Sequence, residues 1–237
     1  MTAPLVFLPG WCLGRGPLQS TVDALDGTIF DLPGYGSAPR IDDFDQAVED
    51  IAGRLAPATP LAGWSLGAQL ALAIAARHPD KVGTLLLVAG TTSFVQRPHW
   101  PHAMPPAMLA DFAAGIAADA EAMLPRFVGG FNRGDARAKH VTADLLRLAD
   151  PRPEAAVLAC GLAWLRDVDL HAEAAAVQAP TLLIHGAADP LMPAAAAQAL
   201  AERMPHAHLT LFDACAHAPF ISCPDEFLAA ARAFLHD

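Results

Sequence analysis

A serine between two glycines most constrains how this chain folds. The pentapeptide Gly63-Trp64-Ser65-Leu66-Gly67 lies between a short apolar run and an Ala- and Leu-rich segment, 68–77, that Pro79 ends. Two glycines around Ser65 leave almost no room for side chains, as in a sharp strand-to-helix turn that holds a nucleophile out into a cleft. A solvent turn is the alternative, since Gly and Ser are common in turns. The apolar run before the motif and the helical segment after it favour the nucleophile.

Short apolar runs alternate with helical patterns along most of the chain. We predict strands at 5–8, 28–32, 61–64, 84–89, 181–185 and 208–212. We predict helices between and after them at 44–55, 68–77, 194–204 and 225–235. Fully apolar strands that alternate with helices indicate an α/β fold whose central sheet is mostly parallel and has helices on both faces.

The middle of the chain has a different pattern, without strand-like runs. Several prolines after residue 96 are followed by helical patterns at 106–118, 119–127, 135–149 and 153–166. We predict a core of residues 1–95 and 171–237, with residues 96–170 inserted as an all-helical cap over the carboxyl edge of the sheet, where α/β sites lie. The alternative is a second helical domain that has no part in the site.

Composition narrows the class of protein. With 54% hydrophobic and 17% charged residues in 237, the chain is typical of a compact globular protein of one or two domains. A net charge of −10 argues against nucleic acid and anionic membranes as partners. Residues 5–8 run directly into Pro9-Gly10 without the basic region of a signal peptide, and no apolar stretch has the length of a membrane span. We therefore expect a cytoplasmic protein.

The cysteines and histidines give no sign of a metal site. The four cysteines form no CxxC pair and no zinc spacing, so we expect separate buried thiols in a reducing compartment: Cys12, Cys160, Cys215 and Cys223. His185 ends a predicted strand, and no second ligand lies at a useful spacing from it. We expect neither a metal nor an organic cofactor.

A serine nucleophile needs a base within hydrogen-bond reach and a group that orients the base. In a strand–elbow–helix architecture the chain order is Ser, then Asp, then His. Asp189 follows the strand 181–185, and His217 lies in a loop between the last strand and the last helix. An Asp before Pro is also typical of a turn or an N-cap, and Asp167 and Asp169 are the alternative acids.

With these residues placed, the chain resembles the α/β-hydrolase superfamily over essentially its full length. Within it, the chain is most similar to the pimeloyl-acyl-carrier-protein methyl ester esterases of biotin synthesis. The motifs that carry the resemblance are Gly10-Trp11, 31-DLPGYG-36, 63-GWSLG-67, 161-GLAWLRDVDL-170 and 216-AHAPFISCP-224. The first three recur widely among α/β-hydrolases, and the last two, with Trp11 and Trp64, are more particular to the esterases.

The resemblance implies roles for individual residues. It implies a catalytic triad of Ser65, Asp189 and His217, and an oxyanion hole formed by the backbone N–H groups of Trp11 and Leu66. Substrate contacts would come from these site residues and from the cap segment Phe127, Val128, Gly129, Gly130 and Phe131. The chain departs from the family in three places: Pro9 replaces the usual His, Ala68 a common third glycine, and Phe131 an expected polar residue.

The implied activity is hydrolysis of a methyl ester on an acyl-carrier protein by an enzyme that we expect to be a monomer. The same fold also serves small-ester esterases, lactonases, C–C bond hydrolases and cofactor-free perhydrolases, and a non-catalytic binding protein is an alternative of another class. A carrier protein is acidic, so docking needs local basic residues. The cap offers four candidates in a short stretch: Arg126, Arg133, Arg137 and Lys139.

Overall fold

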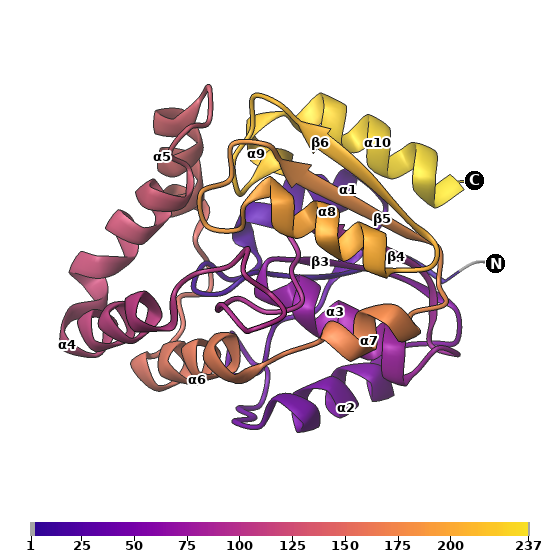
Figure 1. Ribbon diagram of the computed structural model, residues 1–237, viewed down its shortest axis with the longest axis horizontal. Helices are drawn as coiled ribbons and strands as arrows, with labels where there is room; N and C mark the ends of the chain where they lie inside the picture. Colours follow the sequence, from indigo (N-terminus) through magenta and orange to yellow (C-terminus); the bar gives the residue numbers. More distant parts are fainter. Residues whose placement is uncertain (1–2, 237) are drawn as a thin grey trace.

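A central sheet of parallel strands organises the molecule, in a computed structural model that describes residues 3–236 (Figure 1). The described residues contain six strands, in the order β2-β1-β3-β4-β5-β6. The strands are β1 (Val6–Leu8), β2 (Thr28–Ile29), β3 (Thr59–Trp64), β4 (Val82–Val88), β5 (Thr181–Gly186) and β6 (Ala207–Phe212). Every neighbouring pair is parallel, which confirms the predicted α/β fold.

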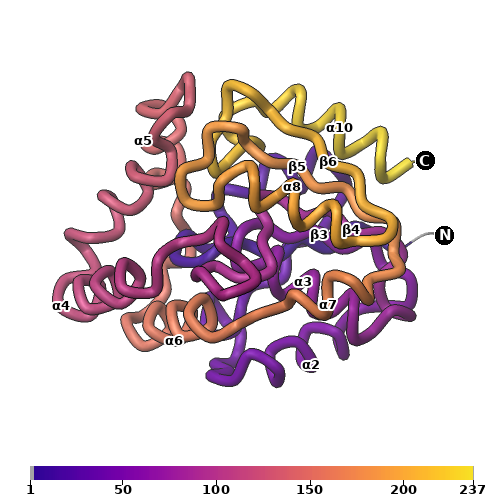
Figure 2. Tube along the Cα trace, in the orientation of Figure 1, coloured from indigo at the N-terminus to yellow at the C-terminus, as the bar shows by residue number. Residues whose placement is uncertain are grey.

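The strands are apolar because the sheet is covered on both faces. Every residue of β1 and β5 is buried, as expected for parallel strands between two helical layers. One layer contains α1 (Gln19–Ala24) and α10 (Pro224–His236), and the other α2 (Phe44–Arg54), α3 (Leu66–Arg77), α7 (His171–Ala176) and α8 (Ala194–Arg203). The trace in Figure 2 shows the same two layers.

Three helices that follow β4 lie beyond the carboxyl ends of the strands (Figure 1). They are α4 (Pro106–Phe131), α5 (Ala138–Leu148) and α6 (Ala155–Asp167). Helix α4 is interrupted at Asp119, which has φ −158° and ψ 85° and whose carboxylate accepts the N–H of Ala122 at 3.0 Å. The break coincides with the predicted boundary between two helices. These three helices lie within residues 96–170, and we keep the name "cap" for that segment.

Short elements were not predicted from the sequence. These are the 3-10 turn η1 (Gly16–Leu18) and the helices α1, α7 and α9 (Pro219–Ser222). None is long enough to show a helical period, so their sequences resemble loops. Within residues 3–236, no helix is both long and apolar enough to span a membrane.

The prediction of separate cysteines is wrong for one pair. A disulfide joins Cys215, which precedes the loop that leads into α9, to Cys223, which directly follows α9. Cys12 is buried and Cys160 half-buried, and both are free. The two paired cysteines are separated by 8 positions, a spacing that matches no common motif, and they meet because the intervening loop folds back.

Candidate active site

Ser65 stands at a strained turn between β3 and α3. Its φ of 56° and ψ of −117° are values that a residue with a side chain rarely adopts. Its N–H donates to the carbonyl of Val88 at 2.9 Å. A Cβ on Gly63 would overlap the Gly67 carbonyl, and one on Gly67 would overlap the Leu8 carbonyl. Both glycines are therefore required by the close approach of the backbone around the serine.

Asp189 and His217 form a buried pair at the carboxyl edge of the sheet. His217 Nδ1 donates to Asp189 Oδ2 at 2.7 Å, and both side chains are almost fully buried. The other oxygen, Oδ1, accepts the N–H groups of Leu191 at 2.8 Å and Met192 at 3.0 Å. These bonds fix the carboxylate, and the carboxylate fixes the imidazole with its proton on Nδ1. Nε2 is then the acceptor, which is the tautomer that a general base needs.

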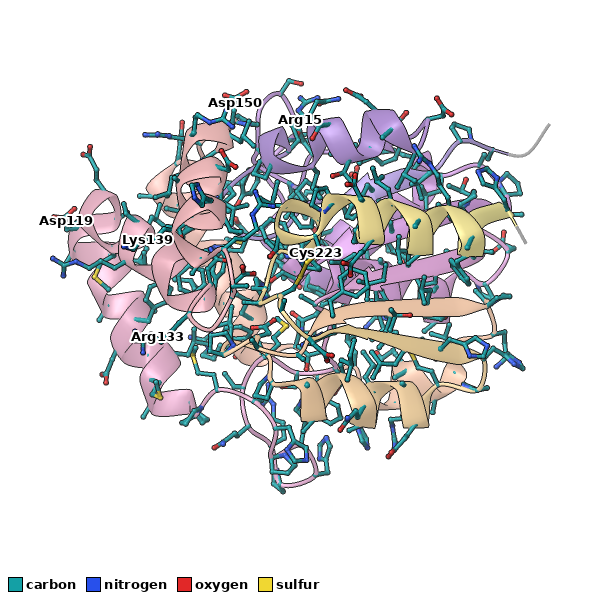
Figure 3. All side chains as sticks on the ribbon, turned by 90° about the horizontal axis from the view of Figure 1, so that it is seen from above. Arg15, Asp119, Arg133, Lys139, Asp150 and Cys223 are labelled. Carbon is teal, nitrogen blue, oxygen red and sulfur yellow. A yellow bond between two sulfur atoms is a disulfide. The ribbon has the colours of Figure 1, made fainter. Side chains whose placement is uncertain are left out.

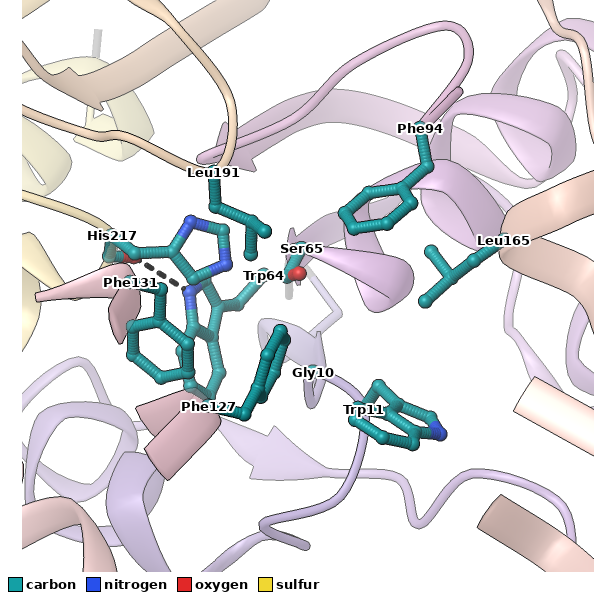
Figure 4. A pocket seen from close by; sticks show the side chains of 10 residues that line it. All are labelled: Gly10, Trp11, Trp64, Ser65, Phe94, Phe127, Phe131, Leu165, Leu191 and His217. Atoms are coloured by element: carbon teal, nitrogen blue, oxygen red, sulfur yellow. Dashed lines mark hydrogen bonds between the residues drawn. The ribbon is translucent and has the colours of Figure 1, made fainter. Parts of the chain in front are cut away.

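Ser65 and His217 face the same small cavity (Figure 4). Its volume is about 10 Å³, and aromatic rings occupy most of the surrounding space. The Phe131 ring lies 4.9 Å from that of His217, and the Phe127 ring 5.4 Å from that of Trp11. The other lining residues are Gly10, Trp64, Phe94, Leu165 and Leu191.

Only the two ends of the predicted substrate-contacting segment reach this cavity. Phe127 and Phe131 are four residues apart on α4 and therefore share a helix face. Val128 is buried elsewhere and its carbonyl accepts Asn132 Nδ2 at 2.9 Å. Gly129 and Gly130 are absent from the lining, and the space beside Gly130 is open.

The loop that carries Trp11 is held by three contacts. The indole Nε1 donates to the Leu158 carbonyl at 3.1 Å, and the N–H of Cys12, whose φ is 70°, donates to the Tyr35 hydroxyl at 2.9 Å. A Cβ on Gly161 would overlap the Trp11 indole. Tyr35 thus supports the loop in which Pro9 replaces the family's His.

The two backbone N–H groups predicted to form the oxyanion hole are those of Trp11 and Leu66. Within residues 3–236, the Trp11 N–H has no acceptor among the protein groups. Leu66 is the first residue of α3, and the first N–H groups of a helix have no partner inside it. A negative charge near this helix end is also favoured by the helix dipole.

The alternative acids lie outside the site. Asp167 is exposed and paired with Arg166 at 2.6 Å, and this hydrogen bond lowers the pKa of the carboxyl. Asp169 pairs with His99 at 3.0 Å. His185 lies beside the buried pair: its Nε2 donates to the Met192 carbonyl at 2.6 Å and lies 3.7 Å from Asp189 Oδ2. Burial lowers the pKa of His185.

Several residues near the site were not predicted from the sequence. Phe94, Leu165 and Leu191 line the cavity from three separate segments, and no local pattern distinguishes them from core residues. Asp135 of the cap bonds to the loop that carries His217. The described residues contain no cluster of three or more His, Cys, Asp or Glu side chains suited to a metal ion.

A larger cavity of about 630 Å³ lies between α4, α5 and α6. Cys12 and Leu13, which directly follow Trp11, form part of its wall, and Arg152 and Glu121 contribute opposite charges. Ser65 is not part of its lining.

The chain belongs to the alpha/beta hydrolase family, whose model matches residues 5–231. It is 38% identical over 235 residues to the pimeloyl-[acyl-carrier protein] methyl ester esterase of Nitrosomonas europaea, an alignment that covers 95% of this chain and 92% of that protein. It is 39% identical to the protein of the same name from Aromatoleum aromaticum, covering 94% of each. The resemblance found in the sequence is therefore confirmed.

Solved structures with the same fold have more distant sequences. An esterase from Exiguobacterium antarcticum superposes with a TM-score of 0.89 at 22% identity, covering 99% of this chain and 92% of that one. The enol-lactonase from Burkholderia xenovorans LB400 gives a TM-score of 0.82 at 20% identity, covering 100% and 93%. At this identity the likeness concerns the fold alone.

Proposed function

We propose that this protein is a serine carboxylesterase that hydrolyses the methyl ester of pimeloyl-acyl-carrier protein in the cytoplasm. One observation carries the esterase assignment: the buried Asp189–His217 pair faces the same cavity as Ser65 on its strained turn. The substrate is assigned from the relatives named for that reaction, which match almost the whole chain.

Catalysis would begin with attack of Ser65 Oγ on the ester carbonyl carbon. His217 Nε2 would take the serine proton, while the Asp189 carboxylate stabilises the imidazolium that forms. The N–H groups of Trp11 and Leu66 would bind the oxyanion of the tetrahedral intermediate. In other enzymes, removal of one side-chain donor from an oxyanion hole raises the barrier by about 3 kcal/mol, which gives the order of magnitude for each N–H group here.

Collapse of the intermediate would release methanol, to which His217 returns the proton. Water would then attack the acyl-serine with His217 again as base, and the free carboxylic acid would leave. These steps use only side chains and backbone groups of the chain. The thioester to the carrier must be spared by positioning, since a thioester is as good an acyl donor as the ester.

The acyl chain needs more room than the closed site offers. A cavity of about 10 Å³ holds no more than a water molecule, whereas small-molecule sites commonly measure about 300 Å³ or more. Phe127 and Phe131 both come from α4. A movement of these rings or of α4 would therefore open the site, and we assign the cap this role.

Basic side chains of the cap would guide the carrier protein. Arg126, Arg133 and Lys139 are exposed, and within the described residues none of them pairs with a carboxylate. Figure 3 shows Arg133 and Lys139 on the cap side of the molecule, away from the sheet. Arg137 is different, because its guanidinium donates to the Ser222 carbonyl at 3.0 Å. Steering would act mainly on association and weaken with salt.

Genetic complementation tests the proposed function. The gene should restore growth without biotin to a strain that lacks its own pimeloyl-carrier methyl esterase, and the Ser65→Ala variant should not. In vitro, the purified enzyme should release methanol from methyl pimeloyl-carrier protein and leave the thioester intact. An enzyme that hydrolyses small esters but fails on this substrate would limit the assignment to a general esterase.

A further inference from the structure

Asp135 is a buried carboxylate that belongs to the cap and not to the candidate triad. It lies in the loop between α4 and α5 and is only 7% exposed. Its Oδ1 accepts the N–H of Arg137 at 2.7 Å and the hydroxyl of Ser222 at 2.9 Å. Its Oδ2 accepts the N–H of Ala216 at 2.9 Å. Aspartate is rarely buried without such partners, so this network accounts for its burial.

The acceptor bonds join the cap to the loop that carries His217. Ala216 is the residue directly before His217. Two further bonds run beside it, from Ala136 N–H to the Ala214 carbonyl and from the Arg137 guanidinium to the Ser222 carbonyl, each at 3.0 Å. The cap loop is therefore fastened to this segment before and after the histidine.

Residues of the α/β core also bond to the backbone around His217. The Trp64 indole donates to the His217 carbonyl at 2.9 Å, and Ala188 N–H donates to the Cys215 carbonyl at 3.0 Å. Of the side chains that fix this backbone, Asp135 supplies the charged acceptor, and hydrogen bonds to a charged group are the stronger kind. It also lies in the loop that follows α4, the helix that carries Phe127 and Phe131.

We propose that Asp135 is a positioning residue that sets the geometry of His217 through the Ala216 N–H and so links the cap to the catalytic base. This inference rests on the proposed role of His217. When the cap loop is seated, the Ala216 peptide is held and the imidazole is aligned between Asp189 and Ser65. Loss of the Asp135 acceptor leaves the buried Ala216 N–H without a partner and frees the loop.

Substitution of Asp135 tests this role. Asn removes the charge and places an amide N–H₂ opposite one of the donors, whereas Asp144→Asn, on an exposed face of α5 where Asp144 pairs with Arg147, is the matched control. We expect Asp135→Asn to lower kcat for p-nitrophenyl butyrate roughly tenfold to hundredfold, with KM changed less than about threefold. The control should keep wild-type kcat and KM.

An NMR measurement distinguishes an effect of Asp135 on the position of His217 from an effect on the stability of the fold. The Nδ1 proton of His217, bound to Asp189, should give a downfield proton NMR signal in the wild type and in Asp144→Asn. In Asp135→Asn we expect that signal to shift or broaden while thermal unfolding stays cooperative. If Asp135→Asn does not fold, Asp135→Ser and Asp135→Ala are measured in its place.

The outcomes are decisive in each case. Wild-type kcat and an unchanged histidine signal in any folded variant at position 135 overturn the inference, and failure of all three variants to fold shows a role in the fold alone, which also overturns it. If Ser65→Ala retained activity, the proposed function would fail instead. The histidine signal would then still report whether Asp135 positions His217.

Discussion

The indole Nε1 of Trp64 donates a hydrogen bond of 2.9 Å to the main-chain carbonyl of His217, 153 positions further along the chain. Trp64, which directly precedes the candidate nucleophile Ser65, thus restrains the backbone of His217, the candidate general base. Both groups are buried, so the carbonyl has no water to replace a lost donor.

Trp64→Phe deletes this donor and keeps an aromatic ring. We expect the unfolding free energy to fall by about 1–3 kcal/mol from the unpaired carbonyl, and by more where the smaller ring leaves a cavity. We also expect kcat for a small ester to fall several-fold, because the His217 backbone is less restrained. Urea unfolding and steady-state kinetics measure the two effects, and wild-type kcat would show that this bond has no part in positioning the base.

Ser65→Ala and His217→Ala should each reduce small-ester hydrolysis by about 10⁴-fold or more, because the serine and its base act as a unit. Asp189→Asn should be severe as well, since the Nδ1 tautomer loses its acceptor. Circular dichroism should show intact folding in all three. Asp167→Asn and Asp169→Asn serve as controls with expected wild-type rates, and a larger loss in either than in Asp189→Asn would reject the assignment of the acid.

Gly161→Ala tests the packing of Trp11. The new methyl group would overlap the indole, which must shift and lose its bond to the Leu158 carbonyl. We expect loss of stability of about 1–3 kcal/mol and a lower kcat. Gly53→Ala is the matched control: nothing lies within 4 Å of its Cβ, and alanine in the last turn of α2 should stabilise by at most about 0.5–1 kcal/mol without changing activity. Chemical denaturation compares the pair, and equal stability of the two variants would contradict the packing argument.

His185 should make the fold sensitive to acid. Burial lowers the pKa of His185 in the folded state below the ordinary value of about 6.5. Just below that pH the histidine is therefore protonated in the unfolded chain but still neutral in the folded chain. Stability contributed by neutral His185 is therefore complete above about pH 6.5 and declines as the pH falls, by at most about 1.4 kcal/mol per pH unit.

Urea unfolding at several pH values between 7.5 and 5 measures this decline. His185→Gln keeps an N–H donor for the Met192 carbonyl but does not titrate. The slope of stability against pH should be shallower in this variant than in the wild type. Equal slopes would mean that other groups cause the acid sensitivity.

Charge reversal in the cap tests the docking of the carrier. The double variant Arg133→Glu/Lys139→Glu should lower kcat/KM for an acyl-carrier substrate several-fold at low salt and leave a small ester unaffected. Arg137 is excluded because of its bond to the Ser222 carbonyl. Arg40→Glu/Arg232→Glu, outside the cap, changes the net charge equally. These two arginines bond Asp42 and the Ala24 carbonyl, neither of which lines the site, so once the variant is shown to be folded we expect little effect on either substrate. Equal losses on both substrates, or a loss that does not depend on salt, would refute steering.

Prediction from the sequence succeeded where the signal was local. The apolar runs that became β3 and β5, and the glycines around Ser65, each reflect a constraint within a few residues. Phe94 and Asp135 could not be singled out, because their importance depends on segments that the fold brings together from far apart. The Cys215–Cys223 disulfide was missed for another reason: the two cysteines are only 8 positions apart, but this spacing matches no common motif.

The order of the candidate catalytic residues along the chain has a consequence for protein synthesis. Ser65 follows β3, Asp189 follows β5, and His217 follows β6, so the acid and the base are translated long after the nucleophile. Because a ribosome makes the chain from its N-terminus, a nascent protein that already contains the serine elbow still lacks both partners. Prematurely terminated products would be inert toward esters, and activity would first arise in chains that are nearly full length.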